Sequence, residues 1–253
     1  MSSTGQFTTR PEVTFAIAGV DALLLQFDQQ LDPCMPGFLA NIRQTILREH
    51  GDVVQEVVPS YASLLVYYEP RLVRTYDLQQ LLEVVVNDTP WLCSVWSVDT
   101  EAPGKLVEVP VWYFPEGHNT APVNDMAAIC KHTGLSQEKV IAEHSGIDYQ
   151  VYALGFAPGF AYLGRVAECL EMPRLAKPRQ HVPAGSVGIA EQQTAVYPQA
   201  SPGGWNILGL SPFQWFNPNS KPMTPVQVGD RIRFNAISEA EYKQLLQAQG
   251  GQS

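Results

Sequence analysis

Residues 155–164 read Gly155-Phe156-Ala157-Pro158-Gly159-Phe160-Ala161-Tyr162-Leu163-Gly164. They stand near the start of a segment, residues 153–230, that holds 9 of the 19 glycines and 10 of the 20 prolines in less than a third of the chain. Short apolar runs separated by such residues are typical of turn-rich β structure. The segment therefore predicts a mainly-β domain in the second half of the chain.

The residues before this segment show strand-like and helix-like patterns in turn. Apolar runs predict strands at residues 13–18, 22–27, 53–58, 63–68 and 106–112. Apolar residues at helical spacing predict helices from Phe38 to His50 and from Asp77 to Val85. The order β-β-α-β-β-α-β is typical of a small α+β sandwich with its helices on one face of a sheet. We expect an N-terminal α+β domain over residues 1–112.

A helical bridge, a barrel or sandwich and a terminal helix are predicted for residues 113–253. Asn124 and Ser136 are suited to cap two short helices, which end near Gly134 and Gly146. Residues 149–156 predict the first strand of the β domain, and residues 226–234 predict a late hairpin strand. The sequence Ser238-Glu239-Ala240-Glu241 is a capping box that predicts the start of a terminal helix.

Composition excludes several classes of protein. The 253 residues contain 16 Lys and Arg against 25 Asp and Glu, a net charge of −9, which disfavours nucleic-acid binding. We expect no membrane association, because no apolar run reaches the length of a membrane span and the polar N-terminus lacks a signal peptide. The cysteines Cys34, Cys93, Cys130 and Cys169 form no C-x-x-C pair, which predicts free thiols in a reducing cytoplasm.

Three loops concentrate residues suited to ligand binding. The first, residues 155–164, presents aromatic side chains on an irregular backbone, although a packed crossover explains the pattern as well. The second lies in a locally cationic run, residues 165–181, in which Arg179 is suited to bind a carboxylate or phosphate or to remain solvated. The third contains Gly203-Gly204, which permit close approach of a ligand, and Trp205, which is either a ligand platform or a core residue.

Familiar catalytic motifs are absent from the sequence. Residues 184–188 read Ala-Gly-Ser-Val-Gly and lack both the first glycine and the following helix of a hydrolase nucleophile elbow, so Ser186 is interpreted as an anion-binding hydroxyl. Paired histidines at metal-binding spacing do not occur, so no metal site is expected. His144 ends the bridging helix, where a cation has a structural role without any catalysis. The phosphate-binding motif G-x-x-x-x-G-K-[ST] does not occur, and no dinucleotide-binding motif G-x-G-x-x-G follows a predicted strand.

Three stretches together resemble the KipI-like family, also called allophanate hydrolase subunit 1, which includes the PxpB-type subunits of bacterial 5-oxoprolinases. They are residues 152–164, residues 182–190 (Val-Pro-Ala-Gly-Ser-Val-Gly-Ile-Ala) and residues 201–209 (Ser-Pro-Gly-Gly-Trp-Asn-Ile-Leu-Gly). The resemblance implies an N-terminal α+β domain followed by a cyclophilin-like β-barrel. It also implies a KipA-like (PxpC-type) sister subunit and a third, PxpA-type subunit. The resulting complex is an ATP-dependent amide hydrolase that opens the lactam of 5-oxo-L-proline to L-glutamate.

The resemblance also suggests site residues for a small anionic amide substrate, with ATP as the co-substrate of the complex and no metal or prosthetic group. Preorganised donors would stabilise the developing negative charge. The implied catalytic set is His144, Arg179, Ser186 and Gln193. The implied substrate-binding set is Phe156, Pro158, Gly159, Tyr162, Pro183, Gly185, Thr194, Gly203, Gly204 and Trp205. We expect the subunit to be inactive alone.

Two other functions stay open at this point. Members of this family include an inhibitor of a sporulation histidine kinase, so a regulatory binding protein is one alternative. A carboxyltransferase component related to urea carboxylase is the other, with any biotin carried by a partner. An enzyme subunit should need Arg179, Ser186 and Gln193, whereas an inhibitor needs only an exposed surface. Self-association also stays open.

Overall fold

The structure is a computed structural model that describes residues 10–28, 32, 34–91, 104–115 and 123–250. The chain divides into two compact units, residues 1–103 and 104–253, which are described separately. The predictions for residues 1–9 and for Cys93 lie outside the described residues.

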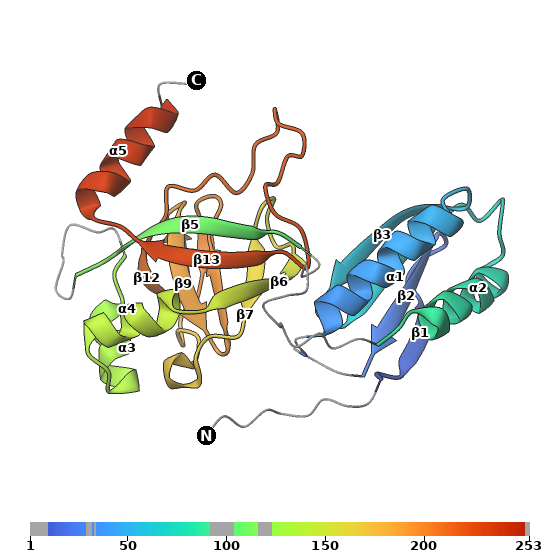
Figure 1. Ribbon diagram of the computed structural model, residues 1–253, viewed down its shortest axis with the longest axis horizontal. Coiled ribbons are helices and arrows are strands. Elements are labelled where there is room, and N and C mark those ends of the chain that lie inside the picture. Colours follow the sequence, from blue (N-terminus) through green and yellow to red (C-terminus); the bar gives the residue numbers. More distant parts are fainter. Residues whose placement is uncertain (1–9, 29–31, 33, 92–103, 116–122, 251–253) are drawn as a thin grey trace. The chain divides into compact units, whose positions relative to one another are not determined.

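The first unit is a four-stranded antiparallel sheet packed against two helices (Figure 1). Its elements are β1 (Val13–Ile17), β2 (Ala22–Phe27), α1 (Met35–Glu49), β3 (Val54–Ser60), β4 (Ser63–Tyr68) and α2 (Thr75–Asp88), and the strand order is β1-β2-β4-β3. Alternate strand residues such as Leu25 and Leu64 form one core with Ile42 of α1 and Leu82 of α2. The predicted helices and strands of residues 13–88 are therefore present.

The second unit is built on a closed seven-stranded barrel with the strand order β10-β7-β6-β13-β5-β12-β9. The strands are β5 (Leu106–Tyr113), β6 (Asp148–Leu154), β7 (Ala161–Gly164), β9 (Ser186–Ala190), β10 (Gln193–Val196), β12 (Asn206–Leu210) and β13 (Arg231–Ala236). A separate two-stranded ribbon pairs β8 (Arg179–Val182) with β11 (Ser201–Gly203). The mainly-β expectation for this half is confirmed.

Two predicted strands differ from the structure. The strand at residues 106–112, expected in the N-terminal domain, is the barrel strand β5, which pairs in parallel with β13. The late strand begins at Arg231 rather than at Val226. The buried Asp230 carboxylate accepts hydrogen bonds from the Gln227 and Lys105 N–H groups, so the preceding residues form a turn instead of a strand.

One of the two predicted caps of the helical bridge is confirmed: Ser136 is the N-cap of α4 (Gln137–Ser145), and its Oγ accepts from the Lys139 N–H. The N-cap of α3 (Met126–Thr133) is Asp125 rather than the predicted Asn124, although Asn124 Oδ1 accepts from the Met126 N–H. The capping box at Ser238 is present: Glu241 accepts from its N–H, and Ser238 Oγ accepts from the Glu241 N–H. It starts α5 (Glu239–Gly250), and a short 3-10 turn, η1, covers Glu168–Leu170.

The barrel unit has two apolar layers. The first contains residues from all seven barrel strands, such as Val187, Leu163 and Phe234, and therefore fills the barrel. The second contains Ala195 and Ile207, from the other face of the same strands, together with Val182 of the ribbon. The ribbon therefore covers the outside of β9, β10 and β12, and this second layer is where the loops of interest converge.

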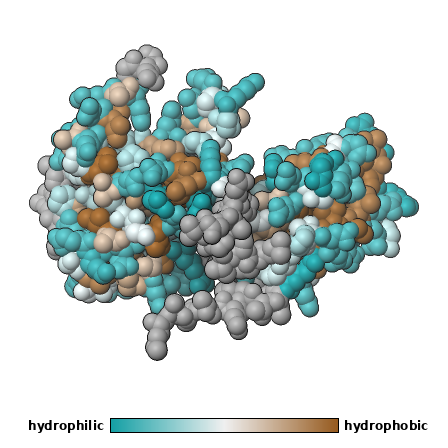
Figure 2. Space-filling model, in the orientation of Figure 1, coloured by the Kyte–Doolittle hydropathy of each residue, from teal (hydrophilic) through white to brown (hydrophobic). Residues whose placement is uncertain are grey.

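The structure also tests the expectations about the cysteines and about membrane-spanning helices. The prediction of free thiols is wrong at Cys34, which is disulfide-bonded, whereas Cys130 and Cys169 form no disulfide. Within the described residues, no helix is long and apolar enough to cross a membrane. Hydrophobic residues remain at the surface of both units, as the brown areas of Figure 2 show. The exposed large hydrophobic residues include Ile17 of β1 and Phe156.

Candidate functional site

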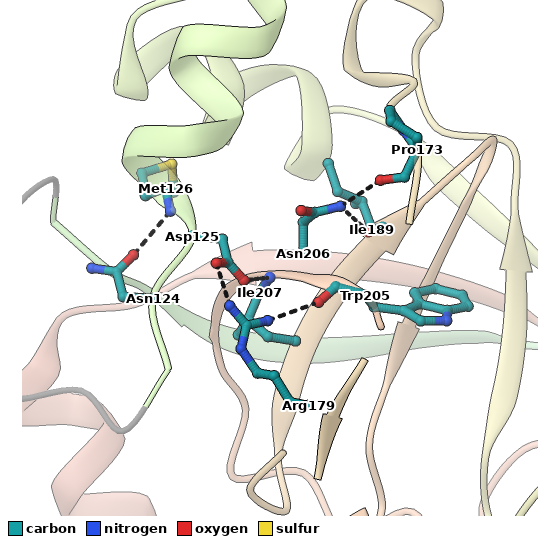
Figure 3. A network of polar contacts seen from close by, with 9 residues as sticks. All are labelled: Asn124, Asp125, Met126, Pro173, Arg179, Ile189, Trp205, Asn206 and Ile207. Carbon is teal, nitrogen blue, oxygen red and sulfur yellow. Dashed lines mark hydrogen bonds and ion pairs between the residues drawn. The ribbon is translucent and has the colours of Figure 1, made fainter. Parts of the chain in front are cut away.

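Arg179 is held at the edge of the barrel by an ion pair with Asp125 (Figure 3). One terminal guanidinium nitrogen, Nη2, lies 2.6 Å from Asp125 Oδ1, and the other, Nη1, donates to the Trp205 carbonyl at 3.3 Å. Asp125 Oδ2 accepts the Ile207 N–H at 2.7 Å. The two side chains are 28% and 10% exposed. This carboxylate therefore joins the start of α3, the ribbon and β12 in one network.

Asn206 extends the network towards the loop that precedes the ribbon. Its amide nitrogen donates to the Pro173 carbonyl at 3.0 Å and to the Ile189 carbonyl at 3.4 Å (Figure 3). The Leu175 N–H donates to the Gly204 carbonyl at 2.8 Å. Residues 173–175 are thereby fixed alongside residues 204–206, which brings two of the predicted loops together.

The aromatic residues of the first loop meet those of the third. Phe160 lies at the centre, with ring centroids 5.3 Å from Phe156, 4.8 Å from Tyr162, 5.6 Å from Tyr197 and 6.0 Å from Trp205. Most of these pairs are edge-to-face, the geometry favoured by the ring quadrupoles. Phe156 is 65% exposed and has a φ of +66°, whereas Phe160, Tyr197 and Trp205 are buried. The cluster therefore presents one exposed ring on a buried aromatic base.

Tyr197 explains why position 203 is a glycine. A β-carbon at Gly203 would overlap the Tyr197 hydroxyl. Burial raises the pKa of that hydroxyl, while the Trp205 backbone hydrogen bond and the positive charges of Arg174 and Arg179 act in the opposite direction. The positive charges of Arg174 and Arg179 therefore both act to lower the pKa of the Tyr197 hydroxyl, which lies beside Gly203.

His144 lies inside the barrel and away from solvent. Its side chain is fully buried and its ring stacks on Phe234 at 4.8 Å. Desolvation lowers its pKa to about 3, so the ring is neutral at physiological pH and its interpretation as a helix-terminal cation is wrong. Tyr113 Oη lies 2.7 Å from Nδ1, and Thr194 Oγ1 lies 2.9 Å from Nε2.

These contacts define one tautomer of His144. Thr194 Oγ1 donates to the Gly188 carbonyl at 3.0 Å, so its oxygen must accept the proton of the His144 Nε2–H group. A neutral ring then accepts at Nδ1, from the Tyr113 hydroxyl. The result is a directed chain of hydrogen bonds from β5 through α4 to β10 and β9, which fixes the register of the strands beneath the site.

Ser186 and its neighbours lie where β9 begins. Gly185 has a φ of +80°, and its N–H donates to the Tyr197 carbonyl. The Ser186 side chain is 1% exposed, and its hydroxyl has no hydrogen-bond partner among the described residues. Gln193 is buried at the start of β10. Most buried hydroxyl groups in proteins form a hydrogen bond. The unpaired Ser186 hydroxyl therefore suggests that a ligand supplies its hydrogen-bond partner.

The structure thus brings together only some of the residues singled out from the sequence. Phe156, Tyr162 and Trp205 meet in the aromatic cluster, and Arg179 contacts the chain beside Gly203 and Gly204. Gly159 approaches the Trp215 carbonyl, while Pro158 is exposed and Pro183 is half-buried. His144 and Thr194 belong to the barrel interior instead.

Four residues of this region were missed as partners in the sequence: Asp125, Arg174, Tyr197 and Asn206. Asp125 precedes Arg179 by 54 residues, so no local pattern pairs the two. The sequence offered one signal for this pair: Asp125 is an acidic residue at the start of a predicted helix, and Arg179 belongs to the cationic run of residues 165–181. Among the described residues, no group of three or more His, Cys, Asp or Glu side chains is placed to hold a metal ion.

Comparison with known proteins identifies the class of this fold. Residues 13–226 match the family described as "Carboxyltransferase domain, subdomain C and D", and the chain belongs to this family. A curated relative, the 5-oxoprolinase B-subunit of Bacillus subtilis (strain 168), is 35% identical over 227 residues, which are 88% of this chain and 92% of the relative. The resemblance recognised in the sequence is therefore confirmed.

Solved structures agree with this assignment. The protein TTHA0988 is 32% identical with a TM-score of 0.70; the match covers 86% of this chain and 40% of that one. The urea carboxylase of Kluyveromyces lactis is 15% identical with a TM-score of 0.71, over 94% of this chain and 23% of that one. The chain thus spans less than half the length of either protein, and the second likeness concerns the fold alone.

Proposed function

We propose that this protein is a subunit of a 5-oxoprolinase-type complex that uses ATP to open the lactam of 5-oxo-L-proline to L-glutamate. The observation that carries the proposal is the match to a relative named as a 5-oxoprolinase B-subunit over nearly the full length of both chains. A KipA-like sister subunit and a third, PxpA-type subunit would complete the complex, and this chain would be inactive alone. We place the complex in the cytoplasm, with residues 1–103 as an α+β domain and residues 104–253 as a cyclophilin-like barrel domain.

The chemistry of the reaction suits a site made of fixed donors. A lactam is a poor electrophile, and transfer of a phosphoryl group from ATP to the amide oxygen would create a better leaving group. Negative charge then develops on groups that preorganised donors stabilise. In this chain the surface beside Gly203, Gly204 and Trp205, flanked by Arg179, is the part we assign to the substrate.

We assign different roles to the four implied catalytic residues. Arg179 faces the loop cluster, and Ser186 carries the unused hydroxyl, so these two are assigned to the substrate. Gln193 starts the strand that continues into Thr194 and is assigned to orient the amide. His144 is assigned a positioning role, because its ring nitrogens contact Tyr113 and Thr194 inside the barrel and its side chain is fully buried.

The proposal is tested by release of glutamate from 5-oxo-L-proline and ATP with this chain co-expressed with its two partner subunits. We expect activity that is lost when this chain is omitted. Replacing Arg179 by Ala should reduce kcat/KM at least tenfold. Arg233→Ala is the matched control, since Arg233 forms a similar Arg–Asp pair with Asp148 at 2.7 Å on other barrel strands. A stable three-subunit complex without glutamate release would refute the proposal.

A carboxyltransferase component is the second candidate, favoured by the description of the matched family and by the fold likeness to urea carboxylase. It predicts transfer of a carboxyl group between a biotin-carrying partner and a small amide such as urea. Carboxylation of urea by a complex that leaves 5-oxo-L-proline unchanged would favour this candidate over the first.

A further inference from the structure

Glu191 occupies a backbone conformation that favours glycine. It is the first of two residues that join β9 to β10, with Ala190 and Gln193 paired across the turn. Its φ is +55°, and a positive φ at this position is typical of type II′ hairpin turns, where glycine is preferred. A carboxylate side chain in a strained position suggests that the side chain has a use.

The Glu191 side chain forms an ion pair with Arg174. Arg174 Nε lies 3.4 Å from Glu191 Oε1, and the two side chains are 53% and 61% exposed. The backbones are also joined, because the Glu191 N–H donates to the Met172 carbonyl. Arg174 is thereby placed between the β9–β10 turn and residues 204–206, to which Pro173 and Leu175 are hydrogen-bonded.

Two arginines therefore flank the same short segment, and each is paired with a carboxylate. The Arg179–Asp125 pair is largely buried, and Asp125 also accepts a backbone N–H group, so this pair is fixed. The Arg174–Glu191 pair is exposed and longer, and exposed pairs contribute little net stability. Of the two cations, Arg174 is the one that a ligand displaces from its partner at low cost.

We propose that Arg174 is an anion-binding side chain at the edge of residues 203–206 and that Glu191 is its internal competitor. The ligand would be a small oxyanion, carried either by a substrate carboxylate or by a phosphate group. Its binding would displace Glu191 from the Arg174 guanidinium while the Arg179–Asp125 pair stays intact. Only the identity of the anion depends on the function proposed above.

The test is a titration of the isolated full chain with inorganic phosphate at constant ionic strength, followed by the amide NMR signals of residues 203–206. Glu191→Gln keeps the size and backbone demands of the side chain but removes its charge. It should tighten phosphate binding about three- to tenfold, the effect of one neighbouring unit charge near a surface. Arg174→Gln should weaken binding, and Glu191→Gln should then have no further effect.

Glu168→Gln is the matched control, because Glu168 is an exposed carboxylate in the same cationic run. It should change the phosphate Kd less than twofold. An equal effect of both Glu variants, an effect of Glu191→Gln that persists without Arg174, or no saturable change at residues 203–206 would each overturn the proposal.

A second titration, with 5-oxo-L-proline in place of phosphate, distinguishes the two sources of the anion. Tighter binding of 5-oxo-L-proline to the Glu191→Gln chain identifies the substrate carboxylate. Tighter binding of phosphate alone identifies a phosphate group. Both titrations use the isolated chain and need no active complex. They therefore test the role of Arg174 and Glu191 even if the proposed function is wrong.

Discussion

Burial of a neutral His144 should make the barrel less stable in acid. Its pKa is about 3 in the folded protein against an ordinary value of 6.5. Between these values the unfolded chain binds a proton that the folded chain does not. Stability is therefore retained above pH 6.5 and is lost progressively as the pH falls towards 3.

The size of this effect follows from the two pKa values. Going from pH 7 to pH 5, the linkage relation gives a loss of about 2 kcal/mol from this one group. Removing the imidazole removes this contribution. His144→Gln should be less stable than the wild type at pH 7, because it loses stacking on Phe234 and one of its hydrogen bonds. The deficit should shrink by about 2 kcal/mol at pH 5.

The assay is urea unfolding at pH 7 and pH 5, followed by the amide NMR signals of β6 and β13, which report the barrel unit. His181→Gln is the control, since His181 is an exposed histidine of the same unit. It should leave the difference in unfolding free energy between the two pH values unchanged. An equal pH dependence in wild type and His144→Gln would refute the assignment of a neutral, buried ring.

Three further predictions follow from the site. Ser186→Ala should leave the free energy of unfolding unchanged or raise it by up to about 1 kcal/mol, because the Ser186 hydroxyl has no hydrogen-bond partner among the described residues. Glutamate release by the complex should nevertheless fall, and unchanged release would remove Ser186 from the site. Asp125→Ala should lower the free energy of unfolding, measured in urea, by about 2 kcal/mol or more, because it leaves the Arg179 guanidinium and the Ile207 N–H without the carboxylate. A loss below about 0.5 kcal/mol would contradict this account. Gly203→Ala should cost about 1–3 kcal/mol through overlap with the Tyr197 hydroxyl, and a Tyr197→Phe background should recover part of this loss; no recovery would indicate that the ring itself is the obstacle.

Local sequence signals predicted most of the elements. The caps at Ser136 and Ser238 form the expected hydrogen bonds because capping depends on residues three apart. Strand β5 was assigned to the wrong half because its partner β13 lies far along the chain, with Arg231 opposite Leu106, and no short-range pattern carries that pairing. The strand predicted from Val226 was too long because the Asp230 carboxylate stabilises a turn through a contact with distant Lys105.

The sequence by itself determined that the second half is β-rich and that three loops carry aromatic, cationic and glycine residues, since these properties depend on composition and local spacing. Only the tertiary structure decided which of these residues meet. It placed Arg179 against Asp125, paired Arg174 with Glu191 and withdrew His144 into the barrel. The physical reason is that charge pairing and desolvation depend on distances in space, and closure of the barrel sets these distances between residues that lie far apart along the chain.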